Sequence, residues 1–127
     1  MRIYTRGGDR GETGLADGSR VRKDHPRVAA CGDLDELSCW LGLVAGGSRR
    51  QDLVRLLENV QRDLFALGAQ LADPGRRVAS RSAKAAVTEA HVARLEREID
   101  RREAALPPLR AFVLPGGSRV GALLHLA

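Results

Sequence analysis

The chain has 127 residues, of which 43% are hydrophobic and 29% charged, and this balance is typical of a folded globular protein and excludes a disordered chain. Aromatic residues make up only 3%, so we expect a core of Leu, Val and Ala, which favour packed helices over aromatic-rich sheets. With no apolar signal region and no apolar stretch long enough to span a bilayer, we expect a cytoplasmic protein without a membrane partner.

The net charge of +5 comes mainly from arginine, which favours a partner that carries phosphate or carboxylate groups. Nucleic acid is one such partner, but proteins that bind single strands interleave basic residues with stacking aromatics. The aromatic residues here are widely scattered along the chain: Tyr4, Trp40, Phe65 and Phe112. A compact polyphosphate therefore fits the composition better than a nucleic acid does.

Residues 1–24 are rich in Gly, Thr, Asp, Ser and Arg without apolar periodicity, which predicts a structured loop or a disordered arm. Apolar residues at steps of three and four then predict a helix over residues 27–45, with two glycines as its end. Cys31 and Cys39 would lie about 12 Å apart along this helix, at about 1.5 Å per residue, which is too far for a disulfide. We expect both to be small buried residues.

The same apolar rhythm predicts a second helix over residues 51–72, ended by Asp73-Pro74-Gly75. A basic, solvated linker is expected over residues 76–84. Thr88 is a suitable N-cap for a third helix, which Pro107-Pro108 must end. Its apolar face is predicted to consist of Val92, Leu95, Ile99 and Leu106.

A short final helix is predicted after Ser118, which is a possible N-cap. The last residues form an apolar helical pattern that stops without a polar taper or a glycine. We therefore expect the chain to be a truncated form of a longer fold.

The segment from Tyr4 to Leu15 combines glycines, threonine hydroxyls and arginines. Such a loop can wrap a triphosphate, because glycine lets the main chain approach and successive N–H groups can converge on one anion. It is neither a P-loop nor a dinucleotide fingerprint, and composition alone leaves a flexible arm equally open.

Four segments taken together resemble the PduO-type ATP:corrinoid adenosyltransferases, over residues 2–127. They are Thr5-Arg6-x-Gly8-Asp9-x-Gly11-x-Thr13, Gly18-x-Arg20-x-x-Lys23, Gly32-x-x-Asp35-Glu36-Leu37, and the stretch Phe112-Val113-Leu114-Pro115-Gly116-Gly117-Ser118. Each segment alone is a weak signal, whereas the ordered combination is specific.

The resemblance implies an all-α fold, a five-helix ferritin-like bundle with an extended glycine-rich N-terminal loop, whose last helix is missing here. It implies a single domain over residues 1–127, with a nucleotide-binding loop over 1–24 and an incomplete bundle over 27–127. It also implies a homotrimer with active sites where neighbouring subunits meet.

The implied activity is transfer of the 5′-deoxyadenosyl group of ATP to the cobalt of reduced cobalamin, which gives adenosylcobalamin and triphosphate. In the family the N-terminal loop holds the triphosphate with Mg²⁺ or K⁺, and no direct protein ligand to the metal is expected. The ATP-binding residues implied here are Thr5, Arg6, Gly7, Gly8, Thr13, Gly14 and Lys23.

Two further residues are implied to act at the corrinoid. Asp35, otherwise a solvated helix carboxylate, would pair with an arginine of the fourth helix. Phe112, otherwise a core aromatic, would lie beneath the corrin ring and help to exclude the lower axial ligand. That exclusion favours the four-coordinate cobalt that is reduced to the Co(I) nucleophile.

The protein itself needs no nucleophile in this reaction, which agrees with the wide separation of His25, His91 and His125. Each of these histidines is expected to be a surface or capping residue. The electron for cobalt must come from elsewhere, and a flavin-type reductase is an open candidate for that partner.

The sequence departs from the family pattern at several positions. Gly7, Arg22, Ala29 and Ser38 stand where threonine, proline, glutamate and asparagine are frequent, and the arginine-rich continuation of the fourth helix is absent. Two alternatives to an active transferase therefore stay open. One is an inactive remnant or an ATP- and corrinoid-binding module, and the weaker one is a basic helical nucleic-acid binder.

Overall fold

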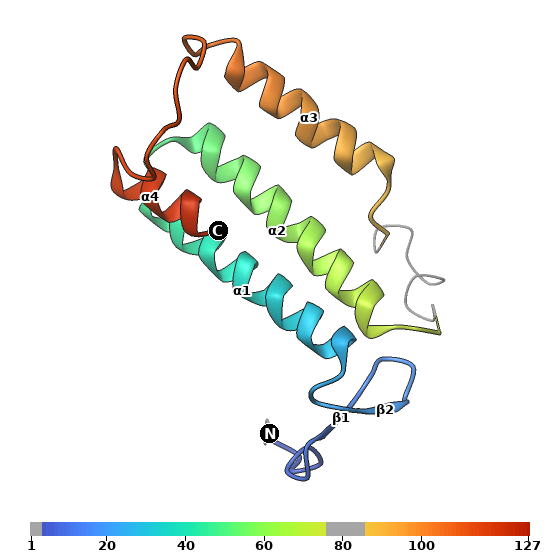
Figure 1. The fold of residues 1–127 in the computed structure, drawn as a ribbon. Coiled ribbons are helices and arrows are strands. Elements are labelled where there is room, and N and C mark those ends of the chain that lie inside the picture. Colours follow the sequence, from blue (N-terminus) through green and yellow to red (C-terminus); the bar gives the residue numbers. More distant parts are fainter. Residues whose placement is uncertain (1–3, 76–85) are drawn as a thin grey trace. The chain divides into compact units, whose positions relative to one another are not determined.

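The computed structural model describes residues 4–75 and 86–127, and within them it contains four helices and one small sheet. In chain order they are β1 (Glu12–Gly14), β2 (Arg20–Arg22), α1 (Pro26–Gly47), α2 (Gln51–Ala72), α3 (Glu89–Glu103) and α4 (Arg119–Leu126) (Figure 1). The mainly helical content confirms the expected fold class, to which a two-stranded hairpin is added. The expected basic linker lies outside the described residues. No helix in the described part of the chain has the length and apolar character to cross a membrane.

The chain divides into two compact units, and α1 and α2 each contribute to both. The first unit comprises Met1–Cys39 and Leu64–Ala86, so it holds the N-terminal arm, the beginning of α1 and the end of α2. The second comprises Trp40–Asp63 and Val87–Ala127, which include α3 and α4. The single domain expected from the sequence stays a prediction.

Helix α1 begins at a proline that follows a histidine cap. The Nδ1 atom of His25 accepts a hydrogen bond from the backbone N–H of Arg27 at 3.1 Å. Pro26 takes the first helical position, where its missing N–H costs nothing. The capping role expected of His25 is therefore confirmed, and α1 begins one residue earlier and ends two residues later than the predicted range.

Helix α2 has the bounds that the sequence predicts, and its last carbonyls are satisfied from outside the helix. The Arg27 guanidinium donates to the Leu71 carbonyl at 2.7 Å, and the Ala16 N–H donates to the Ala72 carbonyl at 2.8 Å. Helix ends otherwise leave such carbonyls without partners. These two bonds fix the hairpin and the beginning of α1 to this end of α2, where Figure 1 shows the hairpin.

In the second unit, ion pairs connect α2 to α3. Arg94 donates to a carboxylate oxygen of Asp63, and the Nε2 atom of His91 lies 3.7 Å from the other oxygen. Arg102 lies 3.6 Å from Asp52 near the start of α2. These pairs hold the polar face of α3 against α2.

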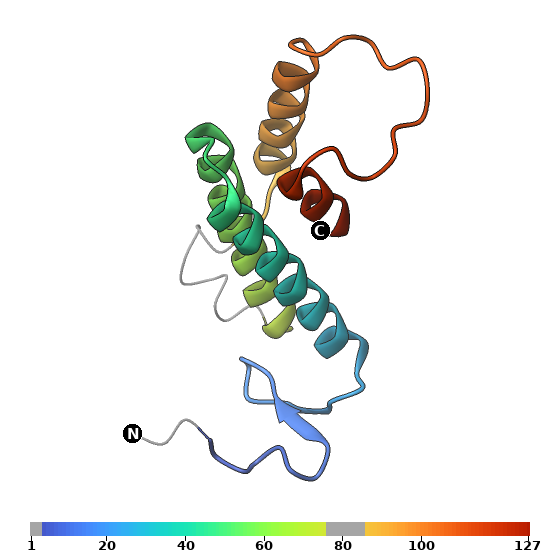
Figure 2. The same ribbon diagram turned by 90° about the vertical axis from the view of Figure 1, so that its left-hand side faces the viewer.

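The predicted caps of α3 and α4 are confirmed. The Nδ1 atom of His91 accepts from the backbone N–H of Thr88 at 3.0 Å, so this histidine also has the expected capping role. Ser118 accepts from the Gly121 N–H at 2.9 Å. In Figure 2 the segment between α3 and α4 forms a wide loop that extends away from these two helices. Helix α3 ends at Glu103, short of the prolines, and single turns continue to Leu106.

The buried hydrophobic side chains of the described residues are Leu41, Val44 and Leu57, which all belong to the second unit. They fit the expected aliphatic core. The predicted apolar face of α3 is exposed, including Ile99 at 61%. The expectation that both cysteines are buried is wrong, because Cys31 is half-buried and Cys39 is exposed, although both are free thiols as expected.

We expect Arg27→Ala to lower the free energy of unfolding by about 1.5 kcal/mol, because it removes a charged, partly buried hydrogen bond to the end of α2. The control is Arg49→Ala, an exposed arginine without a described partner, which should change stability by less than about 0.5 kcal/mol. Urea unfolding followed by circular dichroism measures both. Equal effects of the two substitutions would contradict this role of Arg27.

The pKa of Asp52 is lowered, chiefly by its hydrogen bond from Arg50 and further by the charges of Arg50 and Arg102. A lowered folded-state pKa stabilises the fold above the unfolded value of about 3.9, and the stabilisation is lost as the pH falls through the folded value. Asp52→Asn should therefore melt below the wild type at pH 7, and the gap should close as the pH falls below the unfolded value and through the lowered folded value. The control Arg49→Ala, at an exposed position, removes no carboxyl group and should show no such convergence. A gap that stays constant with pH would contradict the assignment.

Candidate functional site

The N-terminal arm folds into a hairpin. Strands β1 and β2 pair antiparallel with Glu12 opposite Arg22, Thr13 opposite Val21 and Gly14 opposite Arg20. The turn between them is closed by the Leu15 N–H, which donates to the Ser19 carbonyl at 2.8 Å. The sequence was compatible with either a structured loop or a disordered arm, and the structure shows a structured loop that contains this hairpin.

The loop before β1 reverses direction within a few residues. The Thr5 hydroxyl accepts from the Gly7 N–H at 3.4 Å, and the Gly11 N–H donates to the Gly8 carbonyl at 3.2 Å. Arg6 has a left-handed φ of 59°, which is uncommon for a residue with a side chain, and its guanidinium lies 5.5 Å from the centre of the Tyr4 ring. The chain is therefore bent tightly around Gly7 and Gly8.

Lys23 extends over this bend. A Cβ atom added at Gly8 would lie 3.3 Å from both the Cε and Nζ atoms of Lys23 and 3.2 Å from the Glu12 carbonyl oxygen. The Lys23 backbone N–H donates to the Gly11 carbonyl at 2.8 Å. The absence of a side chain at Gly8 thus lets a lysine ammonium lie against the bare backbone of the loop, which is a suitable arrangement for an anion.

The structure brings together most of the predicted ATP-binding residues. Thr5, Gly7, Gly8 and Lys23 are linked by the contacts above, and Arg6 lies within the same bend. Thr13 and Gly14 follow on β1, where Thr13 is half-buried and Gly14 exposed. The described contacts do not join the Thr13 hydroxyl to the bend, and the ATP-binding role of all seven residues stays a prediction.

Sequence reasoning quoted Arg20 only as part of a pattern and missed its contacts. Its Nη2 atom donates to the Gly7 carbonyl at 2.7 Å, and its Nε atom donates to the Glu12 carboxylate at 3.3 Å. The residues of a hairpin alternate between two faces, so Arg20 and Glu12 share one face. Arg22 instead binds Asp24 at 2.8 Å, and this hydrogen bond lowers the pKa of the Asp24 carboxyl.

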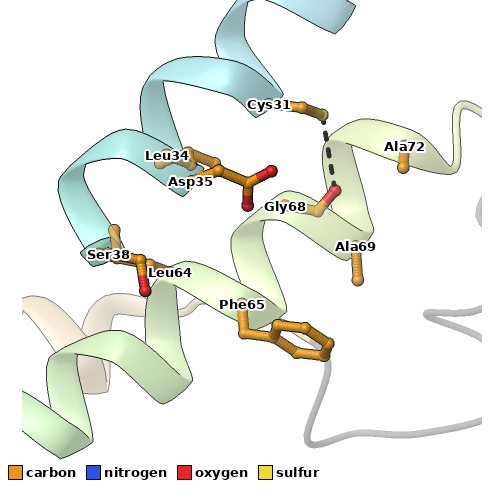
Figure 3. A pocket seen from close by; sticks show the side chains of 9 residues that line it. All are labelled: Cys31, Leu34, Asp35, Ser38, Leu64, Phe65, Gly68, Ala69 and Ala72. Atoms are coloured by element: carbon orange, nitrogen blue, oxygen red, sulfur yellow. Dashed lines mark hydrogen bonds between the residues drawn. The ribbon is translucent and has the colours of Figure 1, made fainter. Parts of the chain in front are cut away.

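A pocket of about 280 Å³ lies between the first part of α1 and the last part of α2 (Figure 3). Its lining is Cys31, Leu34, Asp35, Ser38, Leu64, Phe65, Gly68, Ala69 and Ala72. Asp35 carries the only charge in that lining, and Phe65 is 83% exposed at its edge. Small residues on α2 leave room for an apolar group beside a carboxylate.

Phe112 is fully exposed, at 107% of its reference area, in the segment between α3 and α4 of the second unit. It is therefore no core aromatic of this chain. Val113 and Leu114 beside it are exposed at 63% and 88%. Together they present an apolar surface for which this chain provides no cover among the described residues.

The family model for cobalamin adenosyltransferase matches residues 3–127. The chain belongs to the cobalamin adenosyltransferase family. Its membership confirms the resemblance found in the sequence.

Relatives of the family align with almost the whole chain, but the aligned share of each relative's own length differs. It is 42% identical to the corrinoid adenosyltransferase PduO of Citrobacter freundii over 100% of its own length and 37% of the relative's. It is 43% identical to the corrinoid adenosyltransferase of Mycobacterium leprae over 99% of its length and 68% of the relative's. The chain therefore spans between about a third and two thirds of these relatives.

A solved structure supports the family's helical fold for this chain. It is a variant of the PduO-type ATP:corrinoid adenosyltransferase from Lactobacillus reuteri, complexed with cobalamin and ATP. The TM-score is 0.88 at 34% identity, over 98% of this chain and 69% of the other. A second variant of that protein, complexed with ATP, matches with a TM-score of 0.84 at 36% identity.

We expect Gly11→Ala to loosen the hairpin locally, because Gly11 has a φ of +82° that disfavours a side chain by about 1 kcal/mol although the space around it is open. Gly14→Ala is the control, since its surroundings are equally open and its backbone needs no positive φ. Hydrogen exchange of the Lys23 amide, which donates to Gly11, should become about fivefold faster only in the first variant. Unchanged exchange would show that the bend tolerates a side chain there.

Proposed function

We propose that the chain acts as a corrinoid adenosyltransferase, which transfers the 5′-deoxyadenosyl group of ATP to the cobalt of a reduced corrinoid. Membership of the family over residues 3–127 and the relatives' names support this proposal. The observation that carries it is the packing of Lys23 against the bare backbone of Gly8, since this arrangement suits a phosphate chain.

The arm is proposed to hold the triphosphate. Lys23 supplies a positive charge, and the Gly7–Gly8 bend supplies the Gly8 N–H, which has no acceptor among the described residues. The other predicted contacts are Thr5, Arg6, Thr13 and Gly14. In the reaction the triphosphate is the leaving group, so these groups stabilise the charge that develops on it.

The arm also fits Mg²⁺ or K⁺ that arrives with the nucleotide. Residues 4–75 and 86–127 contain no group of three or more His, Cys, Asp or Glu side chains placed to hold a metal. The hard oxygen donors that such a cation prefers would come from the phosphates and water, in keeping with the expectation that the protein supplies no direct ligand. When bound, the cation neutralises part of the triphosphate charge.

The corrinoid is proposed to contact Asp35 and Phe112. Asp35 places a carboxylate in a small, largely apolar pocket, and Phe112 presents a bare aromatic ring. An apolar ring beneath the cobalt disfavours a water or base ligand there, which eases reduction to Co(I). Co(I) then donates its electron pair to the 5′ carbon of ATP, a Co–C bond forms, and the C–O bond breaks with its electrons on triphosphate.

Assembly as a homotrimer, with sites completed by neighbouring subunits, is also part of the proposal. Large apolar side chains that the described chain leaves exposed support it, among them Phe65, Ile99, Leu106 and Phe112. A flavin-type reductase as electron source and a cytoplasmic location stay predictions from the sequence.

The direct experiment is formation of adenosylcobalamin from chemically reduced cob(I)alamin and Mg-ATP, followed by absorption spectroscopy. Product formation by the wild type, strongly reduced in Lys23→Ala, supports the transferase. Binding of ATP and cobalamin without product would support a binding module instead. Binding of DNA that falls steeply with salt and is not displaced by ATP would support the nucleic-acid alternative.

We expect Phe112→Ala to slow product formation from cob(II)alamin and a reductant by about tenfold or more, because the lower ligand is no longer excluded. The loss should be smaller with cob(I)alamin prepared beforehand, since the protein then need not assist reduction. Leu114→Ala, which removes a similarly exposed apolar side chain, is the control. Equal losses with both cobalt states would argue against a role of Phe112 in ligand exclusion.

A further inference from the structure

The Arg20 side chain forms a bridge inside the arm. It donates to the Gly7 carbonyl at 2.7 Å through Nη2 and to the Glu12 carboxylate at 3.3 Å through Nε. The first bond joins residues that are 13 positions apart. The bridge therefore connects the bend before β1 with both strands of the hairpin.

The bond to Gly7 also determines the direction of the next amide. The Gly7 carbonyl and the Gly8 N–H belong to one planar, trans peptide group, so they point in opposite directions. Because Arg20 holds the carbonyl on its own side, the Gly8 N–H is directed away from Arg20. In the described part of the chain this N–H donates to no protein acceptor.

The charge of Arg20 is already compensated. Its guanidinium forms an ion pair with Glu12, and both side chains are about half exposed, at 49% and 53%. Lys23, by contrast, has no carboxylate partner among the described ion pairs, and its ammonium lies against Gly8. Arg20 therefore acts by orienting the Gly7–Gly8 peptide, whereas Lys23 places a positive charge, unpaired among the described residues, beside it.

We propose that Arg20 is a positioning residue for the triphosphate, which turns the Gly7–Gly8 peptide so that the Gly8 N–H and the Lys23 ammonium serve the same anion. Glu12 keeps the guanidinium in place for this purpose. The inference rests on the proposed function, because it assigns a role within the same nucleotide-binding arm. It differs from a direct phosphate contact by Arg20, because the Nε and Nη2 bonds of the guanidinium are made to Glu12 and Gly7.

Calorimetric titrations of the full chain with ATP, tripolyphosphate and adenosine test this role. Arg20→Ala should weaken the binding of ATP and tripolyphosphate about tenfold, a change that corresponds to about 1.4 kcal/mol, and leave adenosine binding unchanged. Arg22→Ala, which removes an arginine of the same strand that binds Asp24, should change neither by more than about twofold. An Arg20→Ala protein that binds tripolyphosphate as the wild type does would overturn the proposal.

Salt dependence separates positioning from direct contact. Lys23→Ala should reduce the slope of ATP affinity against salt concentration, because it removes a charge at the anion. The double variant Arg20→Ala/Glu12→Ala removes the ion pair without changing the net charge, so it should lower the affinity with an unchanged slope. A reduced slope in this double variant would mean that the arginine contacts the phosphates itself, and the proposal would fail.

Hydrogen exchange of the Leu15 and Lys23 amides shows whether the hairpin survives in Arg20→Ala. If it does not, Arg20→Lys decides, since lysine keeps the positive charge but replaces the rigid fork of guanidinium donors with a single ammonium. Its affinity should lie between wild type and Arg20→Ala, and a loss as large as that of the alanine variant overturns the proposal. Absence of ATP binding by the wild type would overturn the proposed function as well, whereas wild-type binding with an unaffected Arg20→Ala overturns only this inference.

Discussion

The arrangement of the arm depends on how the last carbonyls of α2 are satisfied. Ala16 at the tip of the hairpin donates to Ala72, and Arg27 at the start of α1 donates to Leu71. A helix end without such donors leaves its carbonyls to water. Here these carbonyls accept hydrogen bonds from distant parts of the chain. Leu71 is 44 residues from Arg27, and Ala72 is 56 residues from Ala16. The arm thereby has a defined position relative to the helices of its unit.

An arm that these hydrogen bonds already order loses less conformational entropy when it binds a polyphosphate. The Arg20 bridge, the left-handed Arg6 and the open Gly8 each shape the bend, and Lys23 closes over it. None of these groups is a nucleophile or a base. This agrees with an adenosyl transfer in which cobalt supplies the electron pair and the protein supplies position and charge.

The sequence predicted the helices because their signals are local. The bounds of α2 follow from apolar periodicity and Asp73-Pro74-Gly75, and the caps Thr88 and Ser118 act within one turn. The hairpin strands have three residues each, too few for alternation to show, and the Arg20 and Arg27 bonds span 13 and 44 residues. The grouping of the predicted ATP residues came from family resemblance, and their contacts came only from the structure. The roles of Asp35 and Phe112 stay predictions from that resemblance.

The most direct test of the account is a map of backbone amide shifts as the wild-type chain is titrated with Mg-ATP and, separately, with tripolyphosphate. The account predicts that both ligands shift the same amides, concentrated at Gly7, Gly8, Gly11 and Lys23. Shifts confined to α3 and α4, with an arm that does not respond to either ligand, would contradict it.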